Sequence, residues 1–203
     1  HARRRFLWSG DATDQPSTLG VGDRRCAERI DGFLAVSEWQ ADSLSRESGF
    51  PRGKCFVIRN GVSPELFKGS EDRNHKRLMY SSTPYRGLRH LVRLFPKIRE
   101  AVPGAELFVC SGVEVYADTR GGVPPGYHQI VQELGALREA LGKLEGVTVH
   151  ENMLQSSLAR EFMRSAVLAY PNTFPETSCI TVIEALAGGC VPVTSDLGAL
   201  PET

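Results

Sequence analysis

The sequence lacks several features that would each point to a particular class of protein. Acidic and basic residues number 24 each, so there is no net charge to attract nucleic acid. No stretch approaches the roughly 20 apolar residues of a membrane-spanning helix, and no signal peptide is visible. No Gly-x-Gly-x-x-Gly follows a predicted strand, which argues against a dinucleotide-dependent oxidoreductase. The composition that remains is that of an ordinary globular protein.

Cysteine is sparse and shows no paired pattern. The five cysteines are an odd number, and no two close ones have the spacing of metal ligands. Cys55, Cys110 and Cys190 lie in or beside apolar runs, where a thiol behaves as a small hydrophobe. We therefore expect a protein of the reducing cytoplasm.

The N-terminus carries a local cluster of charge, Arg3-Arg4-Arg5. Such a cluster can contact an anionic membrane surface, so a peripheral position at the inner face of the membrane stays open. A solvated strand flank is the commoner role, and we favour it. The chain opens on His1 and stops at Pro201-Glu202-Thr203, just after a predicted strand and turn, so we expect a fragment of a longer protein.

Short apolar, β-branched runs alternate with longer segments of helical periodicity. Strands are predicted at 6–9, 33–37, 55–59, 77–82, 106–111, 147–151, 167–171 and 191–195. Helices are predicted at 38–48, 87–101, about 127–144, 156–165 and 178–187. This alternation predicts an α/β fold with parallel, Rossmann-like sheets and helices on both faces. The near-continuous apolar strands are typical of buried parallel sheets.

A domain boundary is predicted just after the turn signal Asn60-Gly61, where a charged stretch follows. Residues 1–62 hold three predicted strands, too few for a complete domain, and are interpreted as the C-terminal portion of one Rossmann-like domain. Residues 63–203 form a second such domain, truncated at its end. Within it, the Gly- and Pro-rich segment 113–125 has no clear structure, which is typical of a functional or mobile loop.

The most informative segment runs from Pro171 to Gly189. A strand ends at Pro171, and a helix follows that Thr177 or Ser178 can cap. The helix is apolar nearly all round, so we expect it to be buried, yet Glu184 lies in its middle. A buried carboxylate needs hydrogen-bond donors or a cation. Two ribose hydroxyls would serve, and a core Arg or Lys is the alternative.

The start of the same helix suits a phosphate, because it offers backbone N–H groups and a positive dipole end. Glu184 follows roughly 9 Å further along the axis, a span that a nucleoside diphosphate can bridge. Glu176 precedes the helix, where an attached sugar would project. We therefore predict a nucleotide-sugar site that includes the four residues after Glu176, namely Thr177, Ser178, Cys179 and Ile180.

Two further segments follow strands and point to the same site. After the strand at 77–82, the small residues Ser81 and Ser82 allow close approach of a ligand, and Arg86 can clamp a diphosphate. A surface arginine at a helix start is the alternative. After the strand at 147–151, Asn152 and Met153 can supply an apolar ledge and hydrogen bonds for a base, with plain packing as the alternative. In open α/β sheets, ligands bind at such strand ends.

These motifs together resemble the retaining glycosyltransferases of family 4, which have the GT-B fold. The segment 174–189 resembles their motif of two glutamates separated by seven residues. The segments 58–67, 80–91 and 189–202 resemble the interdomain crossing, the first strand-loop-helix of the donor domain and the strand and turn after the motif. The resemblance covers about residues 33–203.

The resemblance implies transfer of a hexosyl group from a UDP- or GDP-sugar to a hydroxyl of a glycan, lipid or other acceptor, with retention and without a metal or other cofactor. By position, Glu184 would bind the ribose, Glu176 the hydroxyls of the donor sugar and Arg86 the diphosphate. The family's second basic residue falls here on Ser81 or Ser82. Gly10 stands where many members have a histidine, beside Asp11.

A retaining transfer needs electrostatic support for the departing diphosphate, which Arg86 and the helix start can supply. The family's expected route is attack from the face of the leaving group, and no covalent nucleophile is placed by the sequence. A non-catalytic sugar-nucleotide-binding module is the alternative, favoured by Gly10 and Ser82. A sugar-nucleotide epimerase would need an acid/base set around the sugar that we do not find.

Overall fold

The computed structural model of the protein describes residues 4–112 and 128–203. The strands are β1 (Phe6–Trp8), β2 (Gly32–Ala35), β3 (Cys55–Val57), β4 (Asn74–Ser81), β5 (Glu106–Cys110), β6 (Val147–His150), β7 (Ser165–Tyr170) and β8 (Val191–Thr194). The helices are α1 (Arg24–Arg29), α2 (Glu38–Ser43), α3 (Leu88–Ala101), α4 (His128–Gly142), α5 (Gln155–Arg164) and α6 (Ile180–Ala187). A π-helical turn, Leu44–Ser48, extends α2. Short 3-10 turns lie at Arg52–Lys54, Pro64–Phe67 and Leu200–Glu202.

All eight predicted strands and all five predicted helices are present, with shifted ends. Helix α1 was not predicted. The predicted loop 113–125, the first residue of the helix predicted from 127, and Arg3 lie outside the described residues. Among the described residues, no helix is both long and apolar enough to cross a membrane.

The chain divides into two compact units. Unit 1 consists of His1–Gly61, Phe174–Ile180 and Asp196–Thr203, and unit 2 consists of Val62–Thr173 and Thr181–Ser195. The main division therefore falls beside the boundary predicted from the sequence, while two C-terminal segments group with unit 1. The assignment of domains itself stays a prediction.

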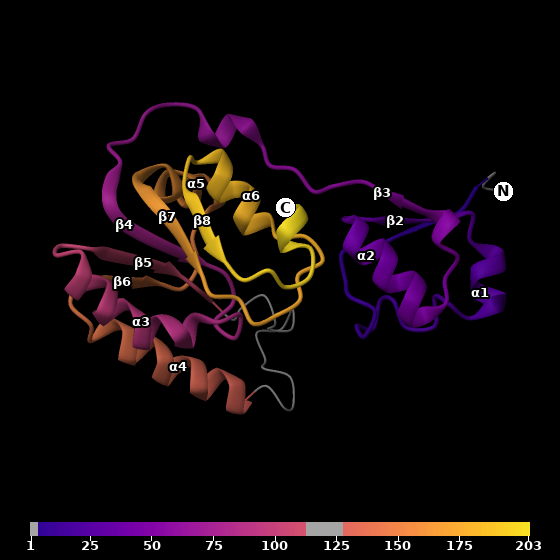
Figure 1. The fold of residues 1–203 in the computed structure, drawn as a ribbon, viewed down its shortest axis with the longest axis horizontal. Helices are drawn as coiled ribbons and strands as arrows, with labels where there is room; N and C mark the ends of the chain where they lie inside the picture. Colours follow the sequence, from indigo (N-terminus) through magenta and orange to yellow (C-terminus); the bar gives the residue numbers. More distant parts are fainter. Residues whose placement is uncertain (1–3, 113–127) are drawn as a thin grey trace. The chain divides into compact units, whose positions relative to one another are not determined.

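Unit 1 contains a three-stranded parallel sheet in the order β1-β2-β3. Its core lies where α1 and α2 cover one face of the sheet, around the buried side chains of Phe33, Leu44 and Phe50 (Figure 1). Both helices begin at polar caps, because Asp23 accepts from two backbone N–H groups of α1 and Ser37 accepts from Gln40 in α2. The caps satisfy backbone donors that the first helical turn leaves open.

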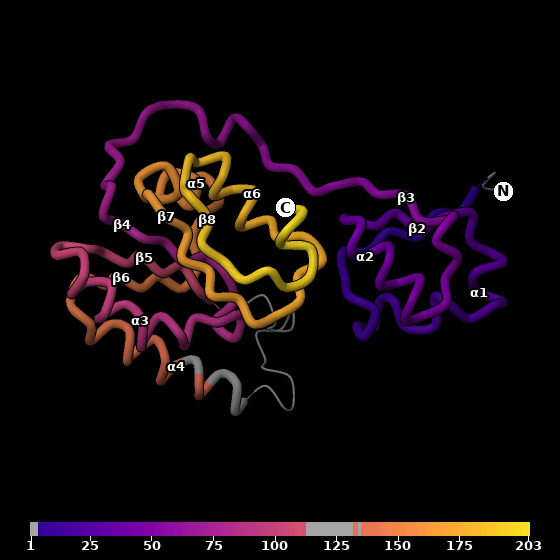
Figure 2. The backbone as a smooth tube through the Cα atoms, viewed as in Figure 1, coloured from indigo at the N-terminus to yellow at the C-terminus, as the bar shows by residue number. Residues whose placement is uncertain are grey.

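Unit 2 contains a five-stranded parallel sheet in the order β6-β5-β4-β7-β8. Helices α3 and α4 cover one face, and α5 and α6 cover the other (Figure 1). From β4 the chain builds outward to β6 and then returns to the other side of β4 to form β7 and β8, a path that Figure 2 traces. The direction of winding changes between β4 and β7, which is the point where open α/β sheets bind ligands.

The expectation that the helix around Glu184 is buried on all sides is wrong. Val182 and Ala185 are buried, but the side chains of Ile180 and Leu186 are 48% and 50% exposed. Helix α6 thus leaves part of its apolar surface exposed. Its apolar character therefore does not translate into burial all round.

Candidate functional site

The loop after β4 is fixed by hydrogen bonds to three successive backbone carbonyls. The hydroxyl of Thr181 donates to the carbonyl of Ser81. The hydroxyl of Ser111 donates to the carbonyl of Ser82 at 2.6 Å, and the hydroxyl of Tyr80 donates to the carbonyl of Thr83 at 2.8 Å. The three donors come from α6, the end of β5 and β4 itself. The predicted ligand loop is therefore anchored to its neighbours, which gives a ligand a preformed surface to meet.

A close backbone approach fixes the turn from this loop into α3. Gly87 has a φ of +97°, and a Cβ at this position would lie 1.9 Å from the carbonyl oxygen of Pro171. The space beside Gly87 is thus filled by the end of β7 rather than left for a ligand. Arg86 precedes this glycine, and its backbone N–H donates to Thr83 at 3.1 Å. The half-buried Arg86 is therefore held at the junction of β4, α3 and the end of β7.

Glu184 is buried as expected, with 7% of the residue exposed. Its carboxylate accepts a hydrogen bond from the side-chain amide of Gln155 at 3.1 Å. Burial raises the pKa of Glu184, and the hydrogen bond from Gln155 opposes this rise. Among the described residues, its partner is thus a neutral amide and not the core Arg or Lys of the alternative. The ionised carboxylate can accept further hydrogen bonds in addition to the one from Gln155.

Gln155 connects the loop after β6, the third segment predicted for the site, to helix α6. This residue begins α5 and directly follows the loop that contains Asn152 and Met153. Asn152 is exposed and Met153 is half-buried, so both can be reached from solvent. Gln155 was not predicted as a site residue. Its signal in the sequence is only that it follows a strand end and carries the donor that Glu184 requires.

Helix α6 is thus where the segments of unit 2 converge. Thr181 binds the loop after β4, and Glu184 binds the start of α5. The two residues are three positions apart and therefore lie on one face of the helix. The structure brings together Glu184, the Ser81–Ser82 loop and the loop after β6 around this face.

In unit 1, the segment around Glu176 is held by a turn near the C-terminal end. Glu176 is 3% exposed, and its backbone pairs with Gly198. A Cβ at Gly198, where φ is +65°, would lie 2.3 Å from the carbonyl oxygen of Glu176. That same oxygen accepts from the backbone N–H of Ala199 at 2.6 Å. Only glycine fits this turn.

The prediction that Thr177 or Ser178 caps the helix is wrong. Helix α6 begins at Ile180, two residues beyond Ser178, after the buried Cys179. The hydroxyl of Thr177 donates instead to the carbonyl of Gly10, far away in the sequence. The hydroxyl of Thr177, which the local sequence pattern predicts to cap the helix, thus binds a residue that is distant in the sequence.

The loop after β1, where the family has a histidine, is also anchored in unit 1. The buried side chain of Gln40 donates to the carbonyls of Ser9 and Asp11 at 3.0 and 2.7 Å. The carboxylate of Asp11 accepts from Ser17. A Cβ at Gly10 would meet nothing within 4 Å. The position of the missing histidine is therefore open, while Asp11 is engaged locally.

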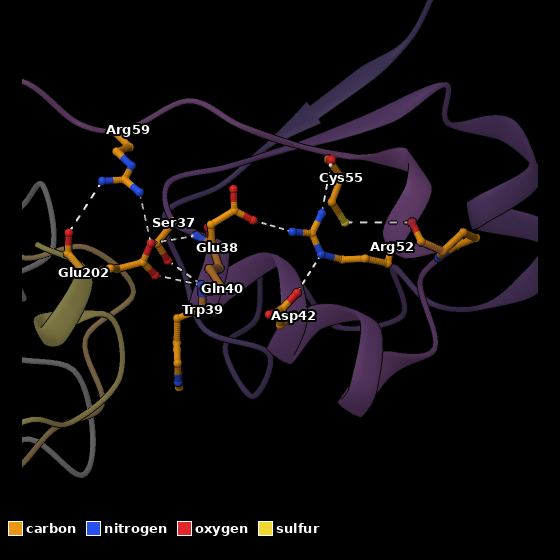
Figure 3. Close-up of polar contacts among 10 residues, drawn as sticks. Ser37, Glu38, Trp39, Gln40, Asp42, Arg52, Cys55, Arg59 and Glu202 are labelled. Carbon is orange, nitrogen blue, oxygen red and sulfur yellow. Dashed lines mark hydrogen bonds and ion pairs between the residues drawn. The ribbon is translucent and has the colours of Figure 1, made fainter.

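The turn at the C-terminal end contributes a carboxylate to α2. Glu202 accepts hydrogen bonds from the backbone N–H groups of Glu38 and Trp39, at 3.1 and 2.7 Å (Figure 3). Arg59 pairs with the same carboxylate at 3.5 Å. A negative charge at a helix N-terminus is favourable. In unit 1, Glu202 therefore serves as a long-range cap of α2.

In the part of the chain that the structure describes, no three His, Cys, Asp or Glu side chains are grouped so that they could hold a metal ion. The candidate site in unit 2 thus consists of a carboxylate, an amide, hydroxyls and an arginine. These groups can bind hydroxyls and phosphates.

Comparison with curated proteins finds relatives over most of the chain, although no family model matches it. It is 24% identical over 197 residues to the alpha-maltose-1-phosphate synthase of Mycolicibacterium smegmatis, which covers 89% of this chain and 47% of that protein. It is 26% identical over 209 residues to a D-inositol 3-phosphate glycosyltransferase of Streptomyces avermitilis, covering 96% of this chain and 43% of that protein. The chain therefore spans about half the length of these relatives.

Solved structures show the same fold. The Anabaena protein HepE, in complex with UDP and glucose, has a TM-score of 0.76 at 17% identity, over 98% of this chain and 55% of that one. Sucrose-phosphate synthase of Thermosynechococcus elongatus has a TM-score of 0.69 at 16% identity, over 96% and 51%. The chain is thus similar to glycosyltransferases in sequence, and it shares its α/β fold with solved glycosyltransferase structures.

Proposed function

We propose that this chain carries the nucleotide-sugar-binding part of a glycosyltransferase, which transfers a hexosyl group from a nucleoside diphosphate sugar to a hydroxyl with retention of configuration. The observation that carries the proposal is the buried carboxylate of Glu184, to which the described residues supply one neutral donor, Gln155. A ribose offers two adjacent hydroxyls to such a group. Binding would replace the solvation that the carboxylate has lost.

The surroundings of Glu184 support a nucleoside. Gln155 extends from the loop of Asn152 and Met153, so that loop lies beside the end of the helix face that carries the carboxylate. Met153 would offer an apolar surface to the base, and backbone groups of the loop would supply hydrogen bonds. The charge on Glu184 would be stabilised by the ribose hydroxyls, which donate to it.

The anchored loop after β4 supports the diphosphate. Thr181 ties this loop to the first turn of α6, whose N-terminal end favours negative charge. Arg86 leaves the same loop and would bind the phosphate oxygens, as an arginine does with its planar set of donors. Arg86 would then stabilise the charge that develops on the leaving diphosphate. Ser81 and Ser82 would contribute polar contacts where relatives of the family carry a second basic residue.

The sugar is assigned by the resemblance. Glu176 precedes α6 in the chain, and we propose that it binds the hydroxyls of the donor sugar. UDP is the favoured nucleotide because structures of HepE hold UDP or UDP-glucose, and GDP is the second choice. The acceptor is proposed as a hydroxyl of a glycan, a lipid or another small molecule. No metal or other cofactor is part of the proposed reaction.

A non-catalytic nucleotide-sugar-binding module is the second candidate. One observation favours it: Gly10 stands in the place where the resemblance leads us to expect a histidine. The two candidates share the donor site and differ in turnover. Release of UDP from UDP-glucose in the presence of acceptors would favour the enzyme, and tight binding without release would favour the module.

The donor site itself is tested by thermal denaturation with and without UDP. We expect UDP to raise the Tm of the wild-type chain and of a control variant, Glu100→Ala, which removes an exposed carboxylate of α3. We expect Glu184→Ala to fold and to lose most of this protection. An equal rise of Tm in all three proteins would refute the assignment of Glu184.

A further inference from the structure

A cavity of unit 2 lies along the exposed side of α3. Its volume is about 550 Å³, within the usual range of small-molecule sites. One wall consists of His90, Arg93, Leu94 and Lys97, and the other of residues 171–173 and Ser195. The four residues of α3 follow the spacing i, i+3, i+4, i+7 and form a single stripe of the helix. None of the residues proposed for the nucleotide lines this cavity.

The wall opposite α3 is held in place by backbone contacts. The carbonyl of Pro171 lies against Gly87 at the start of α3, where any side chain would collide with it. The hydroxyl of Ser195 donates to the carbonyl of Asn172 at 2.9 Å, which ties the end of β8 to this segment. The N–H of Asn172 donates to the carbonyl of Tyr170 at 2.7 Å. The cavity is therefore preformed.

The charge of the cavity is positive. Arg93, Lys97 and His90 line it, and no lining residue is acidic. Within the described parts of the chain, neither Arg93 nor Lys97 pairs with a carboxylate, whereas Arg99 on the same helix pairs with Glu145. Exposure of the helix to solvent accounts for the charge of Arg89. It does not explain why two unpaired cations border one hollow.

The cavity also offers an apolar surface. Leu94 is 43% exposed and lies between the two cations on the stripe, with Pro171 among the residues of the opposite wall. A bare anion would leave these groups in water. A ligand that joins an anion to a small organic group would cover them, which removes apolar surface from water.

We propose that this cavity binds the phosphate group of a small phosphate monoester, with Arg93 and Lys97 on the phosphate and Leu94 and Pro171 against the organic part. The guanidinium supplies paired donors to phosphate oxygens, and the ammonium supplies a mobile point charge. The hydroxyls of Thr173 and Ser195 donate to the carbonyls of Tyr85 and Asn172, so the proposed phosphate contacts are those of the two cations. The proposal is independent of the nucleotide site, since it uses other residues.

The test is an NMR titration of the whole chain with inorganic phosphate and with phenyl phosphate. We expect saturable shifts of the amides of Asn172 and Thr173, and tighter binding of phenyl phosphate because its ring reaches Leu94. The double variant Arg93→Gln/Lys97→Gln should bind both probes about tenfold more weakly or worse. Arg89→Gln, a matched change on the same helix outside the cavity, should bind as the wild type does.

Two results would overturn the proposal. One is unchanged binding of phosphate in a double variant whose melting curve shows that it is folded. The other is loss of the phosphate-induced shifts when UDP is added at saturation, because the phosphate would then have reported the nucleotide site. Failure of the nucleotide site, by contrast, would leave the shifts at Asn172 and Thr173 intact, so the two assignments fail separately.

An experiment with lipid vesicles distinguishes the two possible sources of the phosphate, a lipid headgroup and a soluble ester. Sedimentation with vesicles that contain phosphatidic acid, lost in the Arg93→Gln/Lys97→Gln variant, would assign the phosphate to a lipid headgroup. Binding of phenyl phosphate without sedimentation would assign it to a soluble ester. Sedimentation that is equal in the wild type and the double variant would contradict a role of this cavity at membranes.

Discussion

The side-chain amide of Gln155 donates to the buried carboxylate of Glu184 at 3.1 Å and thereby joins the start of α5 to the middle of α6. The contact gives this buried carboxylate a hydrogen-bond donor, which offsets part of the cost of its burial. It also leaves the carboxylate able to accept more hydrogen bonds. The consequences can be measured in stability, in pH dependence and in nucleotide binding.

The pH dependence of stability follows from the raised pKa of Glu184. A carboxyl group with a raised pKa in the folded state stabilises the protein below its unfolded pKa, about 4.3 for an ordinary glutamate, and loses this contribution as pH rises through the folded value. The variant Glu184→Gln should therefore be as stable as the wild type or more stable at pH 7, and should lose any advantage below the unfolded pKa. Urea denaturation at a series of pH values checks the sign, and a variant that is less stable only at neutral pH would contradict it.

The same pKa predicts that UDP binds more tightly as Glu184 becomes charged. Ribose hydroxyls donate to the carboxylate, so binding favours its ionised form and lowers its pKa. We expect the affinity for UDP to fall as pH decreases through the folded pKa, and we expect this dependence to vanish in Glu184→Gln. Calorimetric titrations at several pH values give both results. A parallel pH profile in the variant would assign the dependence to another group.

Removing the amide of Gln155 should leave Glu184 without its donor. We expect Gln155→Ala to destabilise unit 2 by about 1 kcal/mol at neutral pH, since the hydrogen bond to a charged group is lost at a partly exposed position. Ser156→Ala, the next exposed position of the same helix, is the matched control and should have a smaller effect. Denaturant titration measures both, and equal effects of the two changes would speak against a role of the amide.

The junction at Gly87 should not accept even one added methyl group. Gly87→Ala places a side chain at positive φ and 1.9 Å from the carbonyl oxygen of Pro171, so we expect a loss of about 3 kcal/mol or more. Gly135→Ala is the control, because that glycine lies within α4 and an added Cβ would meet nothing within 4 Å. It should stabilise the chain by about 0.5–1 kcal/mol. Thermal melting distinguishes the two outcomes.

The proposed role of Arg86 predicts a selective loss of affinity. Arg86→Ala should weaken the binding of UDP by about tenfold or more, because charge-assisted hydrogen bonds to the diphosphate are lost. Binding of uridine should change little. Calorimetry with the two ligands makes the comparison, and similar losses for UDP and uridine would show that Arg86 acts on the fold and not on the phosphates.

The fold could be predicted from the sequence because strands and helices alternate with clear apolar periods. Helix α1 was missed since it is short and charged, with three arginines among its six residues, and its start depends on the cap at Asp23. The exposure of Ile180 and Leu186 could not be read from the sequence either. An apolar helix is buried only where another element covers it.

The candidate site could be predicted only in part. The burial of Glu184 follows from the apolar residues around it, but its partner depends on which strand end lies beside α6. Gln155 stands 29 positions away in the sequence, and no local pattern joins the two. Thr177 shows the same limit, because a hydroxyl that could cap the next helix binds the carbonyl of Gly10 instead.

The central claim is most directly tested by a crystal structure of the chain with UDP. We expect both ribose hydroxyl oxygens within about 2.6–2.8 Å of the carboxylate oxygens of Glu184. We also expect the diphosphate to lie beside Arg86 and the first turn of α6. A well-ordered UDP molecule bound elsewhere, with Glu184 still bonded only to Gln155, would contradict the account.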